Sequence, residues 1–121
     1  MTTMPLPSDH LRLTTVDADD RVRIEIHGDL DYENAYLLQD EVAVRLTGRV
    51  GVRHLDIHCA GLGTIDSTGL SVLLMIHRRT TAAGVCLHLE DRPANLERLL
   101  DITGTLDLLT APPAIGPGTS G

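Results

Sequence analysis

The sequence Thr-Ile-Asp-Ser-Thr-Gly-Leu at residues 64–70 constrains the fold more than any other part of the chain. Before it, apolar and polar residues alternate over His54–Cys59, which is typical of a strand with one buried face. After it, residues 70–76 are almost all apolar, which indicates a buried helix. We therefore expect a strand over His54–Cys59, a short loop over Ala60–Thr64, and a helix that starts at the Asp-Ser-Thr-Gly sequence.

The same periodicities predict the other elements. Alternation over Leu11–Thr14 and over Arg21–His27, with the acidic turn Asp17-Ala18-Asp19-Asp20 between them, indicates a hairpin of two strands. Apolar residues at three- and four-residue spacing predict helices, and Asp31 is placed to cap the first of them. The remaining expected elements, in chain order, are that helix up to Thr47, the helix from Asp66 to about Ala82, a strand over Val85–Glu90, a helix that starts at Asp91-Arg92-Pro93, and a short last strand over Leu106–Leu109.

The alternation in the strands decides the layers of the fold. A sheet covered by helices on both faces has almost continuously apolar strands, whereas these strands are apolar on one face only. Strand-helix-strand connections favour parallel pairs, and the initial hairpin adds an antiparallel pair. We predict one α/β domain over residues 10–110, with a mixed sheet of four to five strands and helices mainly on one face, between a disordered leader (1–9) and a disordered Pro/Gly tail (111–121).

The composition excludes several classes of function. Ten arginines, no lysine and seventeen acidic residues give a net charge of −7, which argues against nucleic acid or an anionic membrane as a partner. The only aromatic residues are Tyr32 and Tyr36, so the core is expected to be aliphatic and no platform for stacking bases is present. The N-terminus does not resemble a signal peptide, and no apolar run approaches the ~20 residues of a membrane span, so a cytoplasmic protein is expected.

The two cysteines are expected to be reduced. Cys59 shares the phase of Leu55 and Ile57, whereas Cys86 is out of phase with its apolar neighbours. The two thiols should therefore point to opposite sides of the sheet and form no bridge.

The Asp-Ser-Thr-Gly sequence places two hydroxyls and a carboxylate at a helix N-terminus. Four backbone N–H groups lack helical partners there, and this end of the helix carries about half a positive charge. Asp66 and Ser67 could simply cap the helix. Alternatively, an exposed hydroxyl here is a phosphorylation site, because the same N–H groups could hold a phosphate on Ser67 that adds roughly two negative charges.

Three segments, in order, resemble the anti-sigma-factor antagonist family, also called the STAS domain. Residues 62–73, Leu-Gly-Thr-Ile-Asp-Ser-Thr-Gly-Leu-Ser-Val-Leu, resemble its signature. Residues 26–31 resemble its Gly-Glu-Leu-Asp turn, with Asp29 where glutamate is commoner, and residues 96–104 resemble its closing helix with a Thr-Gly stop. The resemblance covers roughly residues 10–110 and implies the one-sided mixed sheet expected above.

The resemblance implies a regulatory binding protein that is not an enzyme and needs no cofactor. In such proteins the unmodified form binds an anti-sigma factor that is itself a serine kinase, which frees a sigma factor for transcription. The kinase phosphorylates a serine, the complex dissociates, and a serine phosphatase reverses the change. Ser67 matches that serine, and Thr68 is the second choice. The expected partner-binding residues are Asp29, Asp31, Ile65, Asp66, Ser67, Thr68, Gly69, Leu70 and Ser71; we expect a monomer or a weak dimer.

The helix after Ser67 leaves one question open. Its apolar arc is wider than a one-sided layer can cover, so the helix is either deeply buried or partly a docking surface. One face carries Leu70, Leu73, Leu74 and His77, and another carries Val72, Met75 and Ile76.

The polar side of the sheet carries residues that allow other functions. His54, Asp56 and His58 share that face, where His27 and His88 also point, so it is either a solvated surface or a site for a metal or a small ligand. A STAS module within a larger signalling assembly is the other alternative. No Gly-x-Ser-x-Gly elbow, P-loop or His-Glu-x-x-His sequence is present, so catalysis is not expected.

Overall fold

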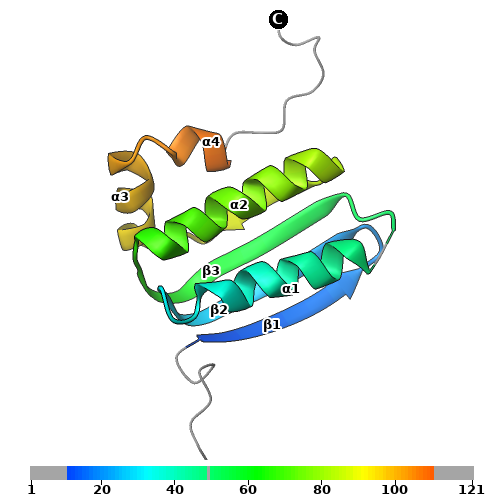
Figure 1. Ribbon diagram of the computed structural model, residues 1–121, viewed down its shortest axis with the longest axis horizontal. Coiled ribbons are helices and arrows are strands. Elements are labelled where there is room, and N and C mark those ends of the chain that lie inside the picture. The colour runs from blue at the N-terminus through cyan, green and yellow to red at the C-terminus, as the bar shows by residue number, and fades with distance from the viewer. Residues whose placement is uncertain (1–10, 49, 111–121) are drawn as a thin grey trace, which may run out of the picture.

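The strands with alternating apolar and polar residues form one four-stranded sheet, in the order β1-β2-β3-β4. The computed structural model describes residues 11–48 and 50–110 (Figure 1); the predicted leader (1–9) and tail (111–121) lie outside them. β1 and β2 pair antiparallel, and the other pairs are parallel, which confirms the predicted mixed sheet. The strands are β1 (Leu11–Ala18), β2 (Arg21–Leu30), β3 (His54–Ile65) and β4 (Cys86–Glu90).

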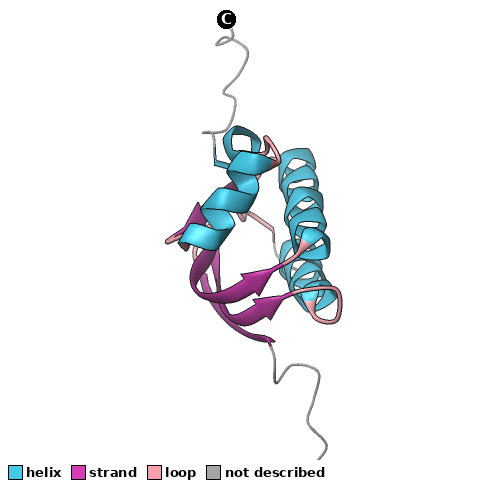
Figure 2. Ribbon diagram, turned by 90° about the vertical axis from the view of Figure 1, so that its left-hand side faces the viewer, coloured by secondary structure: helices cyan, strands magenta, loops and turns pink. Residues whose placement is uncertain are grey.

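The two longest helices, α1 (Ala35–Thr47) and α2 (Ser67–Ala83), lie side by side on one face of this sheet (Figures 1 and 2). The shorter α4 (Leu106–Thr110) packs against β4 and α2, and α3 (Ala94–Ile102) packs against β3. The predicted one-sided helical layer is therefore confirmed. No helix in the described ranges has the length and apolar character to cross a membrane.

The core lies between the sheet and these helices. It is aliphatic, as the scarcity of aromatic residues predicts. Burying these side chains stabilises the fold because it removes apolar surface from water. Its central members are Val22, Ile24, Ile26, Leu55, Ile57, Leu38, Val42, Leu73 and Ile76.

The third strand is longer than its sequence predicts. Residues 60–64, predicted as a loop, continue β3, and Gly61 pairs with His27. A Cβ at Gly61 would come within 2.7 Å of the Ile26 carbonyl oxygen. Glycine at this position therefore permits close strand approach at a shift in register, rather than ending the strand.

The predicted last strand is a helix. Residues 106–110 form α4, in which the buried Leu109 and the half-buried Leu106 are three residues apart, as on one side of a helix. The Leu109 N–H donates to the Thr105 carbonyl oxygen at 3.0 Å. Such short apolar segments fit a strand or a helix equally well by periodicity.

The start of the first helix also differs from the prediction. α1 begins at Ala35, with Asn34 at the N-cap and no side-chain capping bond. Asp31 Oδ1 instead accepts from the N–H groups of Glu33 at 3.0 Å and Asn34 at 3.2 Å. Asp31 therefore closes the turn that precedes the helix.

Candidate functional site

The ends of β2 and β3 bring two distant connections together. Leu30 at the end of β2 pairs with Ile65 at the end of β3. The turn before α1 therefore lies beside the start of α2. Such edges, where neighbouring parallel strands end, are common positions for functional groups in α/β proteins.

Asp66 ties these two connections with both of its carboxylate oxygens. Its backbone is extended at the N-cap of α2, and Oδ1 accepts from the Gly69 N–H at 2.9 Å. Oδ2 accepts from the Tyr32 N–H at 3.1 Å, 34 residues away in sequence. The predicted capping role of Asp66 is confirmed, and the same carboxylate also holds the β2–α1 turn.

Asp29 fixes the other side of this edge. Its Oδ1 accepts from the Thr64 N–H at 3.0 Å, just before α2. A Cβ at Gly63 would lie 2.6 Å from the same oxygen, so a larger residue there would have to displace the Asp29 carboxylate. Asp29, Asp31 and Asp66 thus all lie at the end of the sheet where α2 begins, and each accepts backbone N–H groups there.

The hydroxyls of Ser67 and Thr68 remain unused. Both residues are exposed in the first turn of α2, and neither hydroxyl makes a hydrogen bond to any other described residue. Since Asp66 supplies the cap, the helix start does not need the Ser67 hydroxyl. That hydroxyl is therefore accessible to a partner or a modifying enzyme.

The other predicted partner-binding residues divide into exposed and buried ones. Ser71 is exposed one turn after Ser67, and Ile65 is half-buried. Gly69 is buried and Leu70 is only 8% exposed. These two residues pack inward and support the exposed surface without presenting side chains on it.

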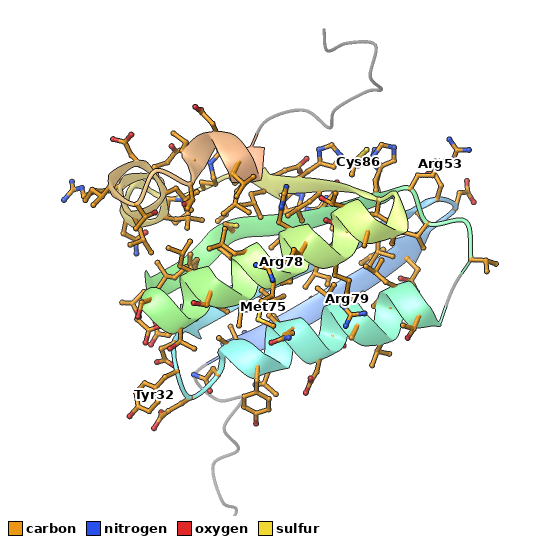
Figure 3. The ribbon with its side chains drawn as sticks, turned by 45° about the horizontal axis from the view of Figure 1, so that its top comes forward. Tyr32, Arg53, Met75, Arg78, Arg79 and Cys86 are labelled. Atoms are coloured by element: carbon orange, nitrogen blue, oxygen red, sulfur yellow. The ribbon has the colours of Figure 1, made fainter. Side chains whose placement is uncertain are left out.

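Two residues of this edge were missed by sequence reasoning. Tyr32 is 73% exposed and projects at the end of the molecule where α2 begins (Figure 3). Tyr36, in the first turn of α1, is half-exposed. The signal was present, because a chain with an aliphatic core has both of its aromatic residues in one short segment. Asn95 of α3 donates from Nδ2 to the Gly63 carbonyl oxygen at 2.7 Å. No local sequence pattern around Asn95 predicts this contact.

The wide apolar arc of α2 is mostly buried. Of its predicted members, Val72, Leu73 and Ile76 belong to the core together with Leu70. Met75 is the exception, since it is 47% exposed. The deep-burial alternative therefore holds for most of the arc, and only the part around Met75 faces solvent.

The polar face of the sheet is occupied by pairs of its own side chains. The buried Asp56 accepts two bonds from Arg21 Nη1, at 2.8 and 2.6 Å, and this hydrogen bond raises the pKa of Arg21. His54 Nδ1 lies 3.1 Å from His88 Nε2, and His58 Nε2 lies 2.8 Å from Glu90 Oε1. Across residues 11–48 and 50–110, no group of three or more His, Cys, Asp or Glu side chains could hold a metal ion.

The cysteines lie as their phases predict. Cys59 is buried on the core side, where burial raises the pKa of its thiol to about 12. Cys86 is half-buried, and it pairs in register with His54 of the polar face. Both are free thiols, so neither contributes a cross-link.

Comparison with known proteins places this geometry in a family. A family model described as "Mlab, STAS domain" matches residues 13–110. No curated protein matches the chain. Several solved structures are similar in fold along most of their length, although their sequence identities are low.

An anti-sigma factor antagonist from Mycobacterium paratuberculosis is 18% identical, with a TM-score of 0.72 over 85% of each chain. A putative anti-sigma factor antagonist from Thermotoga maritima is 24% identical, with a TM-score of 0.71 over 81% of this chain and 82% of that one. The Bacillus protein SpoIIAA, also an anti-sigma factor antagonist, has been solved in unphosphorylated and phosphorylated forms. Its unphosphorylated form is 17% identical, with a TM-score of 0.67 over 78% of this chain and 81% of that one.

Proposed function

The chain belongs to the STAS domain family, and we propose that it is an anti-sigma-factor antagonist controlled by phosphorylation of Ser67. In its unmodified form it binds an anti-sigma factor that is a serine kinase, and so releases a sigma factor. Phosphorylation by that kinase ends binding, and a serine phosphatase restores it. The kinase supplies the catalysis, and this chain is its substrate and ligand in the cytoplasm.

The observation that carries the proposal is the free, exposed hydroxyl of Ser67 at a helix start that Asp66 already caps. A kinase can reach this hydroxyl, and modifying it breaks no hydrogen bond within the described chain. Phosphorylation therefore acts on the surface and leaves the fold intact. Thr68, also exposed, is the second candidate acceptor.

Charge supplies the switch. A phosphate on Ser67 adds about −1.5 to −2 charge at neutral pH. It joins an edge where Asp29, Asp31 and Asp66 already carry carboxylates. A partner that fits the unmodified edge then meets excess negative charge and loses affinity, because juxtaposed like charges disfavour a complex.

The partner-binding surface consists of the exposed residues of this edge. Ser67, Thr68 and Ser71 contribute small polar side chains, and Tyr32 contributes a large amphipathic one. Tyrosine is enriched among the residues that dominate binding energy, because it covers much area at little entropic cost. Tyr32 is therefore the anchor that we add to the surface derived from the sequence.

Affinity capture from the lysate of the native host tests the proposal. Wild type, Ser67→Asp and Ser67→Asn serve as baits, because asparagine matches aspartate in size but lacks its charge. We expect wild type and Ser67→Asn to retain a small ATP-binding serine kinase, and Ser67→Asp to lose it. Equal retention of one kinase by all three baits would show that charge at Ser67 does not control binding.

A second candidate is a STAS module that works in a larger assembly without a dedicated kinase. The match to the STAS family model identifies the domain without identifying a partner, so it is compatible with this candidate as well. In that case the same baits retain a partner that is not a kinase, and Ser67→Asp retains it as well as wild type does.

A further inference from the structure

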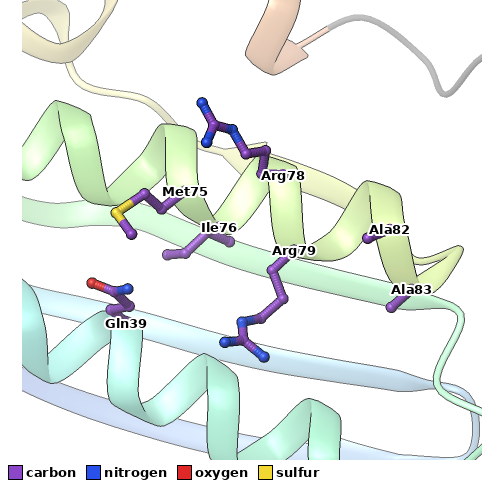
Figure 4. Close-up of a pocket in the computed structure, with 7 residues that line it drawn as sticks. All are labelled: Gln39, Met75, Ile76, Arg78, Arg79, Ala82 and Ala83. Carbon is purple, nitrogen blue, oxygen red and sulfur yellow. The ribbon is translucent and has the colours of Figure 1, made fainter.

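A second surface lies along the solvent side of the two long helices. α1 and α2 border a groove of about 610 Å³, within the range of ligand sites (Figure 4). Gln39 lines it from α1, and α2 contributes the other lining residues: Met75, Ile76, Arg78, Arg79, Ala82 and Ala83. This groove contains the exposed part of the apolar arc of α2.

The groove combines an apolar floor with a polar rim. Ile76 is buried at its base, Met75 is half-exposed beside it, and the small side chains of Ala82 and Ala83 line its far end. Gln39 projects from α1 toward α2, and the Arg79 guanidinium extends from α2 toward α1 (Figure 4). Apolar contact and one positive charge are therefore offered together.

The arginines of this groove differ from four other arginines of the described residues. Arg21, Arg23, Arg45 and Arg92 each form an ion pair with a carboxylate. Arg78 and Arg79 are exposed and form no ion pair with any other described residue. In a chain of net charge −7, two adjacent unpaired cations beside an apolar groove mark a surface that complements an acidic partner.

We propose that this groove binds an amphipathic helix of a partner protein, with apolar residues over Met75 and Ile76 and a carboxylate on Arg79. A valley between two neighbouring helices is shaped to accept a third, as in other helix-in-groove complexes. Between Met75 and Ala83 the valley extends about 12 Å, so two to three turns of a helix fill it. A small ligand would stay largely exposed in such an open valley, whereas ligand sites bury most of the ligand surface.

The hollow on the other side of α1 offers a useful contrast. It measures about 410 Å³ and is lined by Arg12 together with Asp40, Glu41 and several apolar residues. Its charges are of both signs, so it lacks the one-sided complementarity of the α1–α2 groove.

The groove is separate from the edge of the sheet where β2 and β3 end and where Ser67 lies. Arg79 is twelve residues after Ser67 on the same helix, or about 18 Å along its axis. A partner in the groove need not touch Ser67, so this inference does not rest on the proposed phosphorylation. One helix then presents two surfaces, and only one of them is sensitive to phosphate.

A selection experiment tests the proposal. A randomised library of helical peptides of about 16 residues, roughly four turns, is selected for binding to the wild-type protein. The binding sites of the enriched peptides are then located from the NMR chemical-shift changes that they cause in the labelled protein. We expect peptides with apolar residues at three- and four-residue spacing and an acidic residue on the same face, shifting Met75, Ile76 and Arg79. Selected peptides that lack the acid, or that shift other surfaces only, would overturn the proposal, as would failure to enrich any groove binder.

Matched variants sharpen the result. Arg79→Glu and Met75→Lys should each weaken the selected peptide by about tenfold or more, since each removes one of the two complementary features. Arg98→Glu, an exposed arginine of α3 without an ion pair in the described ranges, makes the same charge change elsewhere and should bind normally, as should Ser67→Asp. Circular dichroism checks that each variant is folded. If Arg98→Glu weakened peptide binding as much as Arg79→Glu does, the effect would come from net charge and not from the groove. If the wild-type protein self-associated and Arg79→Glu abolished this, the groove would bind a second copy of this chain. Either result contradicts the proposal.

Discussion

Asp66 and Ser67 are neighbours with different tasks. Asp66 holds the start of α2 and the turn at Tyr32 through two hydrogen bonds, whereas the Ser67 hydroxyl holds nothing within the described chain. This division separates the structural role of the Asp-Ser-Thr-Gly sequence from its accessible hydroxyl. The sequence alone left both residues as possible caps, because only the geometry shows which side chain turns back onto the helix.

Denaturation of two alanine variants distinguishes these tasks. Asp66→Ala should lower the free energy of unfolding by about 1–2 kcal/mol, because it removes a helix cap. Ser67→Ala should stay within about 0.5 kcal/mol of wild type, as exposed residues without bonds usually do. Urea titrations measure both. A loss in Ser67→Ala as large as in Asp66→Ala would mean that the hydroxyl is structural after all.

Gly69 is the residue at which this edge is most tightly packed. A Cβ there would overlap the Leu30 carbonyl oxygen and lie 2.8 Å from Ile65 Cγ1. Overpacking costs about 1–3 kcal/mol, which outweighs the gain of at most about 1 kcal/mol from replacing glycine in a helix.

We therefore expect Gly69→Ala to lower the free energy of unfolding by about 1–2 kcal/mol and to displace the first turn of α2. Urea titration and NMR shifts of the Ser67 and Gly69 amides report the two effects. A variant as stable as wild type with unchanged shifts would contradict this packing.

At the scale of elements, β1 is attached to α1 by a polar network. Glu41 Oε2 accepts from Thr15 Oγ1 at 2.6 Å and from Arg45 Nε at 2.8 Å, and Arg45 also pairs with Asp17. Burial alone would raise the pKa of Glu41, but the bonds from Thr15 and Arg45 outweigh it and lower the pKa. The network therefore favours the ionised carboxylate in the folded state.

The sign of its pH dependence follows. A carboxyl whose pKa is lowered by folding stabilises the protein at pH values above its pKa in the unfolded state. This stabilisation is lost as the pH falls through the pKa of the folded state. Wild type should therefore exceed Glu41→Gln in stability near neutral pH, and the difference should vanish toward acid pH. Thermal melts from neutral to acid pH measure it, with Glu33→Gln, at an exposed glutamate, as the control. A difference that does not change with pH would exclude this electrostatic origin.

Periodicity predicted most elements and misjudged two for physical reasons. The alternation of Val22, Ile24 and Ile26 identified β2, because a strand with one buried face requires it. The predicted loop over Ala60–Thr64 is instead part of β3, and its glycines 61 and 63 allow close approach to β2 and to Asp29. The segment Leu106–Leu109 is too short for its apolar periodicity to distinguish a strand from a helix. It forms a helix that packs against β4 and α2.

At the scale of the whole molecule, the candidate site is an edge built from several separate segments. The sequence predicted its centre, Asp66 to Thr68, since those residues are adjacent and lie at a helix start. It could not predict Tyr32 or Asn95 as members, because they reach the edge only through the pairing of Leu30 with Ile65 and the packing of α3. The α1–α2 groove was likewise invisible, since it depends on how two helices lie together.

In the proposed switch, phosphorylation changes the surface charge and leaves the fold unchanged. Aspartate in the first turn of a helix is favourable, so Ser67→Asp should fold like wild type while it loses the kinase. The same variant should still bind peptides in the α1–α2 groove. These two results together would place phosphate-sensitive and phosphate-insensitive binding on one helix.

The most direct test is the phosphate occupancy of Ser67 in protein isolated from its native host, compared between the partner-bound and the free fractions after size separation. Because the chain has no lysine, trypsin cleaves after Arg53 and Arg78, and one peptide, residues 54–78, contains Ser67, Thr68 and Ser71. We predict phosphate on Ser67 in the free fraction and its near absence from the kinase complex. Phosphate on Thr68 instead, no phosphate at all, or equal occupancy in both fractions would contradict the switch.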